Sequence, residues 1–316
     1  MPEIVTLGET MIAMAPSGYG SLRYISDYKM RIAGAESNLA IGVSKLNHSA
    51  GWISRVGDDE LGYYVRNQIR AEGVDTSRVM FDTEHRTGLM IKETSYAGET
   101  KVYYYRENSA ASHMSAGDLD EEYIRQARII HITGITPVLS DSCKELVNFC
   151  IDTAKKYGIW ISFDPNIRRK LWKERDYTAY IKEIALQSEI VMLGADEAEV
   201  LFGTRNETVV FDKLFQNGNA RYVAIKDGGS GAFVSDGARM IKIEPYPCKV
   251  LEPIGAGDGF NAGFLAGVLE EKDLELCGKM GAVAGALATE TPGDIEGYPT
   301  REKMMVLLNS EREIYR

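Results

Sequence analysis

The stretch Glu252-Pro253-Ile254-Gly255-Ala256-Gly257-Asp258-Gly259-Phe260 decides the fold, because a glycine turn here runs directly into a long apolar helix. Gly255 and Gly257 allow backbone conformations that are closed to other residues. Their amides, together with that of Ala256, can point at one anion at the helix N-terminus, where the helix dipole also favours negative charge. The stretch therefore predicts a helix that begins at a site for an oxyanion, such as a phosphate group.

Asp258 lies in the first turn of this helix, beside the expected anion. A carboxylate there can take a proton from an attacking hydroxyl. The alternative is structural, since aspartate is also a good helix cap. Two other phosphate motifs do not fit, because the third glycine of a dinucleotide fingerprint is replaced by Phe260 and no Gly-Lys-Ser/Thr follows.

Outward from this stretch, short apolar strands alternate with amphipathic helices. Residues 4–7, 129–132, 159–163, 190–193 and 222–225 have the strand pattern. Near-continuous apolar strands between helices are typical of a parallel sheet that is covered on both faces. We expect an α/β fold with a mainly parallel sheet, and 316 residues are enough for one large domain or for a large domain plus a small one.

Residues 87–106 break the alternation. Two β-rich segments, 87–94 and 101–106, flank Tyr96-Ala97-Gly98-Glu99, which is a hairpin pattern. A hairpin inserted between α/β units is a natural lid, and the alternative is an edge hairpin of the main sheet.

Composition excludes several classes of function. The formal net charge of −10, with no long run of Lys and Arg, argues against a nucleic-acid partner. The four cysteines form no Cys-x-x-Cys pair and the four histidines have no ligand spacing, so no zinc or dithiol site is expected. No long apolar span or leader is visible, so we expect no membrane partner and a reduced, cytoplasmic protein.

Gly255-Ala256-Gly257-Asp258 before an apolar helix resembles the C-terminal signature of the ribokinase (PfkB) family of carbohydrate kinases, and residues 34–40 (GAESNLA) resemble its N-terminal signature. The resemblance covers essentially the whole chain. It implies a ribokinase-like α/β fold in a single domain over residues 1–316, with a doubly wound, mainly parallel sheet and a small β-sheet lid formed by insertions at about 11–33 and 87–106. It also implies ATP and Mg²⁺ as cofactors and a homo-oligomer that assembles through the lid.

The resemblance also implies a set of site residues. Asp258 would be the catalytic base, and Gly255, Ala256 and Gly257 would form the anion hole. Glu197 would act on magnesium through water, although Gly194 replaces the Asn that usually precedes it by three positions. Glu252-Pro253-Ile254 departs from the family's monovalent-cation pattern, which leaves that cation open. The ATP and phosphate contacts would be Asn166, Arg168, Lys226, Gly228, Gly231, Gly255, Ala256, Gly257, Ala286 and Thr289.

The substrate is expected to be a sugar acid. Tyr104 and Arg106 lie on one face of the hairpin, and with Arg168 they would bring two guanidinium groups to a carboxylate. Residues 104–110 and 134–140 resemble the branch of the family that phosphorylates the primary hydroxyl of 2-keto-3-deoxygluconate. By that resemblance the substrate contacts are Gly34, Asn38, Met90, Tyr104, Arg106, Ile135, Arg168 and Asp258. A fructokinase or another neutral-sugar kinase, and more distantly a non-enzymatic sugar or nucleotide sensor, remain alternatives.

Overall fold

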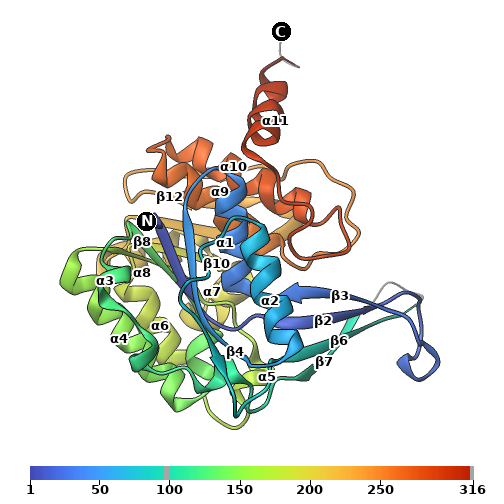
Figure 1. Ribbon diagram of the computed structural model, residues 1–316. Coiled ribbons are helices and arrows are strands. Elements are labelled where there is room, and N and C mark those ends of the chain that lie inside the picture. The colour runs from blue at the N-terminus through green and yellow to red at the C-terminus, as the bar shows by residue number, and fades with distance from the viewer. Residues whose placement is uncertain (96–99, 314–316) are drawn as a thin grey trace.

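The computed structural model describes residues 1–95 and 100–313, and it contains two sheets (Figure 1). The large sheet has nine strands in the order β13-β12-β11-β10-β9-β8-β1-β4-β5. Neighbouring strands from β11 to β5 are parallel, while β12 and β13 are antiparallel at one edge. Its strands are β1 (Ile4–Leu7), β4 (Ala50–Gly57), β5 (Val79–Asp82), β8 (Ile129–Thr133), β9 (Trp160–Asp164), β10 (Ile190–Gly194), β11 (Tyr222–Lys226), β12 (Ala232–Ser235) and β13 (Met240–Ile243).

Helices cover both faces of the large sheet, so its strands are buried and apolar, as a parallel sheet requires (Figure 1). One face packs against α1 (Ala35–Lys45), α2 (Glu60–Ala71), α9 (Ala256–Leu269) and α10 (Leu274–Ala288). The other packs against α3 (Glu121–Ile124), α4 (Asp141–Tyr157), α6 (Thr178–Gln187), α7 (Ala195–Phe202) and α8 (Glu207–Asn217). The short α5 (Arg169–Trp172) follows β9, and α11 (Arg301–Glu313) ends the described chain.

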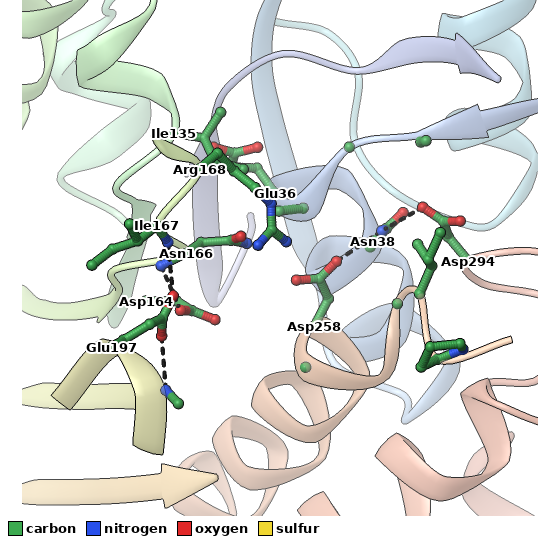
Figure 2. Close-up of a pocket in the computed structure, with 18 of the residues that line it drawn as sticks. Glu36, Asn38, Ile135, Asp164, Asn166, Ile167, Arg168, Glu197, Asp258 and Asp294 are labelled. Carbon is green, nitrogen blue, oxygen red and sulfur yellow. Dashed lines mark hydrogen bonds between the residues drawn. The ribbon is translucent and has the colours of Figure 1, made fainter. Parts of the chain in front are cut away.

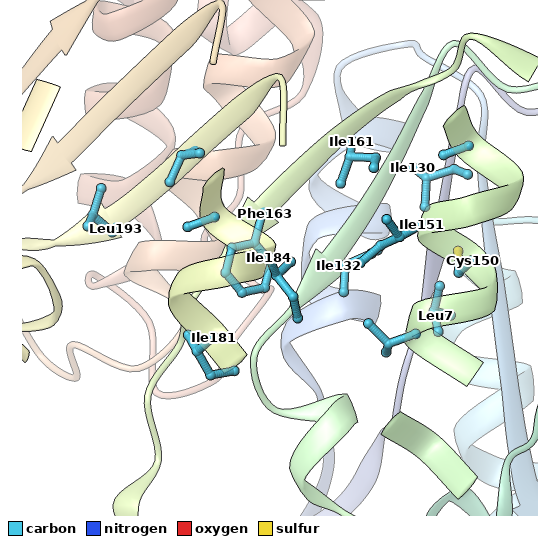
Figure 3. Close-up of a cluster of buried hydrophobic side chains, with 14 of the residues drawn as sticks. Leu7, Ile130, Ile132, Cys150, Ile151, Ile161, Phe163, Ile181, Ile184 and Leu193 are labelled. Atoms are coloured by element: carbon cyan, nitrogen blue, oxygen red, sulfur yellow. The ribbon is translucent and has the colours of Figure 1, made fainter. Parts of the chain in front are cut away.

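Local sequence determines where several helices begin and end. The side chain of Ser140 accepts a hydrogen bond from the amide of Cys143 at the start of α4, and Gly158 ends that helix in the left-handed conformation. Asp59 caps α2 in the same way as Ser140 caps α4. On its buried face, α4 carries Cys150 and Ile151, which lie with Ile130 of β8 in the core (Figure 3). This is the environment of a cysteine that only fills space.

The small sheet has four strands in the order β3-β2-β6-β7, and we call it the lid sheet. Its strands are β2 (Met11–Pro16), β3 (Tyr28–Ala33), β6 (Leu89–Thr94) and β7 (Thr100–Tyr105). They fall within the two predicted insertions, and the sheet extends away from the helices on one side of the molecule (Figure 1). The expected hairpin turn at 96–99 lies outside the described residues.

The structure places the other predicted features plainly. His131 is buried against the hydroxyl of Ser162, and burial lowers the pKa of its imidazole to about 4. Over residues 1–95 and 100–313, no group of three or more His, Cys, Asp or Glu is arranged to hold a metal. Within the same residues, every helix is too short or too polar to cross a bilayer.

Candidate active site

A cleft of about 610 Å³ opens between the lid sheet and the carboxyl ends of the parallel strands. This is where ligands bind in open α/β sheets. Its walls come from the residues that follow β1, β8, β9, β10 and β11, from the first turns of α1 and α9, and from β6 and β7 (Figure 2). The predicted site residues in its lining are Gly34, Asn38, Met90, Tyr104, Arg106, Ile135, Asn166, Arg168, Glu197, Lys226, Gly228, Gly255, Gly257 and Asp258.

Only the first glycine of the turn, Gly255, has the special conformation that was predicted for Gly255 and Gly257, since Gly257 lies within α9 without a positive φ. Gly255 is the N-cap of α9 with φ of 82°, in the left-handed region, and Ala256 is the first helical residue. A β-carbon on Gly255 would lie 2.3 Å from the carbonyl oxygen of Asp294, so no larger residue fits here without rearrangement. The first amides of a helix have no partner within it. At the start of α9 the amide of Ala256 donates to the carbonyl of Pro253 at 3.4 Å, and the next amides, those of Gly257 and Asp258, are available to an anion in the cleft.

Asp258 lies in the first turn of α9, and its carboxylate Oδ2 accepts a hydrogen bond of 2.8 Å from Nδ2 of Asn38 (Figure 2). Burial raises the pKa of this carboxyl to about 7. The bond from Asn38 acts in the opposite direction, and the nearby charges of Asp164 and Asp294 add to the increase. A carboxyl with a pKa near neutrality suits a general base that must accept a proton and release it again.

A second carboxylate, Asp164, lies at the end of β9 and is tightly held. Its Oδ2 accepts hydrogen bonds from Nζ of Lys226 at 2.9 Å and from Nδ2 of Asn261 at 2.5 Å. Burial opposes its ionisation, but the charge of Lys226 and these hydrogen bonds outweigh burial and lower its pKa. Lys226 also lies close to Gly257, so its ammonium is a fixed positive charge beside the glycine turn.

Two groups near Asp164 provide oxygens that suit magnesium. Oδ1 of Asn166 is buried with no hydrogen-bond partner, and Asn166 itself has φ of 38°. The carboxylate of Glu197 accepts hydrogen bonds from the amides of Gly194 and Ile167, both at 2.7 Å (Figure 2). Burial raises the pKa of Glu197, and the charge of Asp164 adds to this effect. Magnesium is usually held by one or two carboxylates, phosphate oxygens and water, so these residues fit the ion.

The two predicted arginines differ in their surroundings. Arg106 forms an ion pair with the buried Glu9, in which its Nε lies 2.6 Å from Oε2. Ser109 donates to the other oxygen of Glu9 at 2.5 Å, so this carboxylate is fully engaged. Arg168 is exposed at the cleft, and its side chain has no ion pair or hydrogen bond to any described residue. Its guanidinium therefore keeps its donors for a ligand.

Four predicted contacts lie outside the lining of the cleft. Ala256 is enclosed between the two glycines, and Gly231 occupies a left-handed turn where a β-carbon would collide with Ile243. Ala286 and Thr289 end α10, where the hydroxyl of Thr289 donates to the carbonyl of Ala286 at 2.7 Å. The nucleotide contacts of Gly231, Ala286 and Thr289 remain predictions.

The sequence reasoning gave no role to six acidic residues that line the cleft: Glu9, Glu36, Asp164, Asp196, Asp227 and Asp294. The carboxyl of Glu36 accepts from the hydroxyls of Thr133 and Thr136, and burial raises its pKa. A local signal existed for Glu9, Glu36 and Asp164, since Glu9 follows the apolar strand β1, Asp164 ends β9, and Glu36 stands within the N-terminal signature. For Asp294 the only signal in the sequence was its position in a loop that contains Gly293 and Gly297.

The arrangement can therefore deprotonate a hydroxyl at Asp258 while backbone amides and Lys226 face a transferring anion. Comparison with known proteins agrees with this chemistry. The model of the pfkB family carbohydrate kinases matches residues 1–301. The 2-dehydro-3-deoxygluconokinase of Bacillus subtilis (strain 168) is 35% identical over 316 residues, covering 99% of this chain and 97% of that protein.

Two solved structures superpose on the chain, the first with a family relationship and the second with the same fold. The PfkB protein from Polaromonas sp. JS666 superposes with a TM-score of 0.88 at 32% identity, covering 96% of this chain and 99% of that one. A ribokinase II from E. coli, solved with ATP and Mg²⁺, superposes with a TM-score of 0.91 at 23% identity, covering 98% of this chain and all of that one.

Proposed function

Because the chain belongs to the PfkB family of carbohydrate kinases, we propose that it transfers the terminal phosphoryl group of ATP to the primary hydroxyl of 2-keto-3-deoxygluconate, also called 2-dehydro-3-deoxygluconate. The product is the 6-phosphate. The observation that carries the proposal is the position of Asp258, a carboxyl with a pKa of about 7, beside the glycine turn in a cleft where the side chain of Arg168 has no partner among the described residues.

In the reaction, Asp258 takes the proton of the sugar's primary hydroxyl, and the oxygen attacks the terminal phosphorus of ATP in line. The bond between that phosphorus and the bridging oxygen breaks, and ADP leaves with its electron pair. The amides of the turn at Gly255–Gly257 stabilise the negative charge on the transferring group. Such preorganised donors are typically the largest single contribution to phosphoryl transfer.

The residues near Asp164 serve the nucleotide. Asn166 and Glu197 would hold magnesium directly or through water, and the bound ion would neutralise and position the phosphates. Lys226 is held by Asp164 and Asn261, which keeps its charge beside the glycine turn. The ATP and Mg²⁺ in the E. coli ribokinase II structure support this part of the proposal.

The acidic end of the substrate is assigned to Arg168. A guanidinium can hold a carboxylate through two parallel hydrogen bonds, and this one has all its donors free among the described residues. Arg106 is already neutralised by Glu9, so it is better suited to orient Tyr104 and a sugar hydroxyl than to bind a second charge. Of the two arginines that were predicted to bind the substrate carboxylate, we therefore assign only Arg168 to it.

One observation favours a neutral sugar as the second candidate. With Arg106 neutralised, the cleft offers a single available guanidinium, which a hydroxyl-rich ketose such as fructose can also use. A sensor without activity is a weaker candidate, because binding alone gives no reason to place a carboxyl of raised pKa beside the glycine turn.

The test is ADP release by the purified protein with ATP and Mg²⁺, comparing 2-keto-3-deoxygluconate, fructose and ribose. We expect kcat/KM for the sugar acid to exceed that for fructose by at least a hundredfold, since sites built for a charged or hydrogen-bonding group reject analogues that lack it. Preference for fructose would overturn the carboxylate assignment and keep the kinase. No ADP release with any sugar would contradict the proposed activity.

Two further properties belong to the proposal. Consumption of ATP suits a cytoplasmic enzyme, as does the absence of any disulfide among the four cysteines. We also propose that the protein assembles into a homo-oligomer through the lid sheet, whose strand β7 is an unpaired edge.

A further inference from the structure

Lys92 is an unusual residue for a lid strand, because its side chain is buried. It stands in the middle of β6, and only 3% of the residue is exposed. Met90, two positions earlier on the same face of the strand, lines the cleft, so Lys92 also points inward. A buried ammonium needs charged or polar partners to offset the loss of water.

The partners of Lys92 are two carboxylates from the other side of the cleft. Its Nζ lies 2.7 Å from Oε1 of Glu252 and 3.4 Å from Oδ1 of Asp294. Both side chains are largely buried as well. Glu252 begins the turn that leads to Gly255, and its amide and that of Leu251 bond to the carbonyl of Thr289. The lysine thus links the lid sheet to the residues that lead into the glycine turn at Gly255–Gly257, which we call the anion turn.

Asp294 continues this link to the catalytic base. Its Oδ2 accepts from Nδ2 of Asn38 at 3.4 Å, and the same Nδ2 donates to Asp258 at 2.8 Å (Figure 2). The backbone of Asp294 also packs directly against Gly255. A shift of Asp294 would therefore move both the turn and the amide that orients Asp258.

A second cation holds the same segment. Arg31 on β3 forms an ion pair with Glu296, two residues beyond Asp294. Further along, the hydroxyl of Tyr298 donates to the carbonyl of Gly255 at 2.9 Å. The segment Gly293–Tyr298 therefore lies between two cations of the lid sheet and the glycine that begins α9.

We propose that Lys92 is a positioning residue whose ammonium acts as a built-in cation, holding Glu252 and Asp294 so that the anion turn and Asp258 keep their reactive geometry without a diffusible monovalent cation. The inference rests on the proposed phosphoryl transfer. It also gives a physical reason why Glu252-Pro253-Ile254 departs from the family's monovalent-cation pattern. The space beside the carboxylate of Glu252 is already occupied by the ammonium of Lys92.

The first test compares turnover of the wild-type protein in potassium chloride and in choline chloride at equal ionic strength. We expect kcat to be unchanged within about twofold, because the required charge is already present. A strict requirement for potassium would overturn the proposal.

The second test is Lys92→Ala, with Lys101→Ala as the matched control, because Lys101 is an exposed lysine on the neighbouring strand β7. We expect kcat of Lys92→Ala to fall on the order of tenfold or more with a smaller change in KM, as for a misplaced reactive group. Methylammonium or potassium, but not choline, should restore part of kcat. Wild-type kcat in this variant, or a loss that no small cation restores, would contradict the assignment.

Thermal stability can be measured without any catalytic activity, so it tests this inference separately from the proposed function. Potassium or methylammonium should raise the Tm of Lys92→Ala above its value in choline and leave the Tm of the wild type unchanged, because a cation that binds only the folded state stabilises it. Equal salt effects on both proteins would overturn the proposal. If Lys92→Ala does not fold, Glu252→Gln decides: a lowered kcat supports the link and an unchanged kcat refutes it.

Discussion

Two arginines lie at the same cleft, and their partners decide what each can do. Arg106 is bound to Glu9, which is almost completely buried, whereas Arg168 is exposed and its side chain has no described partner. Removing one member of a buried ion pair leaves an uncompensated charge and typically costs about 3–5 kcal/mol. Removing an arginine that binds only the ligand has no such cost.

Arg168→Ala is therefore expected to raise KM for the sugar acid on the order of tenfold to a hundredfold, the effect of losing one charge-assisted hydrogen-bonded contact. Its KM for fructose and its Tm should change little. Arg106→Ala should lower Tm and impair both sugars together. Steady-state kinetics with both sugars and thermal melting test this, with the exposed neighbour Arg169→Ala as control. Equal losses for both sugars in Arg168→Ala would remove the carboxylate assignment.

The raised pKa of Asp258 gives a pH dependence. Below about pH 7 the carboxyl is protonated in the free enzyme and cannot accept the proton of the sugar, so kcat/KM should rise through pH 7 and then level. Asp258→Asn should bind sugar and ATP nearly as the wild type does and lose at least about a hundredfold in kcat. Near-normal turnover in this variant, or a profile flat from pH 5 to 8, would exclude Asp258 as the base.

The same carboxyl should reduce stability at high pH. Its pKa is about 7 in the folded protein against an ordinary value of 3.8, so the unfolded chain ionises first and stability falls as pH rises from about 4 to 7. Asp258→Asn removes this effect. Its Tm relative to wild type should increase from pH 5 to pH 8, measured by calorimetry, and a difference that is constant with pH would show that Asp258 ionises as readily folded as unfolded.

Sequence reasoning named the residues that we propose to act by their own chemistry, and it missed the residues that hold or neutralise them through tertiary contacts. Asp258 and Arg168 stand in recognisable local patterns, at the start of a helix and after a strand. The bond between Arg106 and Glu9 joins positions 97 apart, and no local pattern records that the arginine is neutralised. Which charged side chains in the cleft remain free to bind a ligand is therefore decided by tertiary contacts.

At the scale of elements, two helix ends use a left-handed glycine for different reasons. Gly158, after α4, has φ of 68°, and a β-carbon there would meet no atom within 4 Å. Gly255, before α9, has φ of 82° and is pressed against the backbone of Asp294. The first glycine supplies conformation only, and the second also supplies the close approach that shapes the anion turn.

Replacement by alanine should separate these roles. Gly158→Ala should cost about 1 kcal/mol of stability, the left-handed penalty, and leave kcat unchanged. Gly255→Ala has the same penalty and a 2.3 Å contact that must be relieved, so the turn should shift and kcat should fall at least about a hundredfold. Denaturant titration and ADP release measure the two quantities. Equal kcat in both variants would mean that the turn is not part of the catalytic machinery.

Five central strands of the large sheet, β1 and β8 to β11, were predictable because they are apolar and alternate with amphipathic helices. The strands at 11–33 were harder to recognise, since their residues are less periodic and the stretch was expected only as an insertion. The antiparallel edge of β12 and β13 was also not anticipated. The residues of these two strands have the same pattern as any other short strand. The direction of β12 relative to β11 is set by the tight turn at residues 227–231, which is too short for the crossover that a parallel pair needs.

At the scale of the whole molecule, the site exists only because the chain brings its far ends together. Asn38 and Asp258 are 220 positions apart, and Lys92 and Asp294 are 202 apart. The order of the two signatures indicated the first juxtaposition through family resemblance. Nothing in the sequence indicated the second, because a single lysine in a hairpin strand normally faces solvent.

The lid sheet has an exposed edge that a partner chain can extend. Strand β7 is last in the order β3-β2-β6-β7, and its Tyr105 is 61% exposed. An unpaired edge with large apolar side chains is a template for pairing with another chain, and natural proteins block such edges with charge where pairing is unwanted. A second copy of this chain is the proposed occupant.

Tyr105→Lys should therefore dissociate the oligomer, because an edge lysine blocks pairing between strands. Light scattering should give a multiple of 35.0 kDa for the wild type and 35.0 kDa for the variant. Met240→Lys is the control, since Met240 is exposed on β13, the edge strand of the large sheet, and should leave the mass unchanged. A monomeric wild type, or dissociation by Met240→Lys alone, would show that the lid edge does not pair and that its exposed tyrosine needs another explanation.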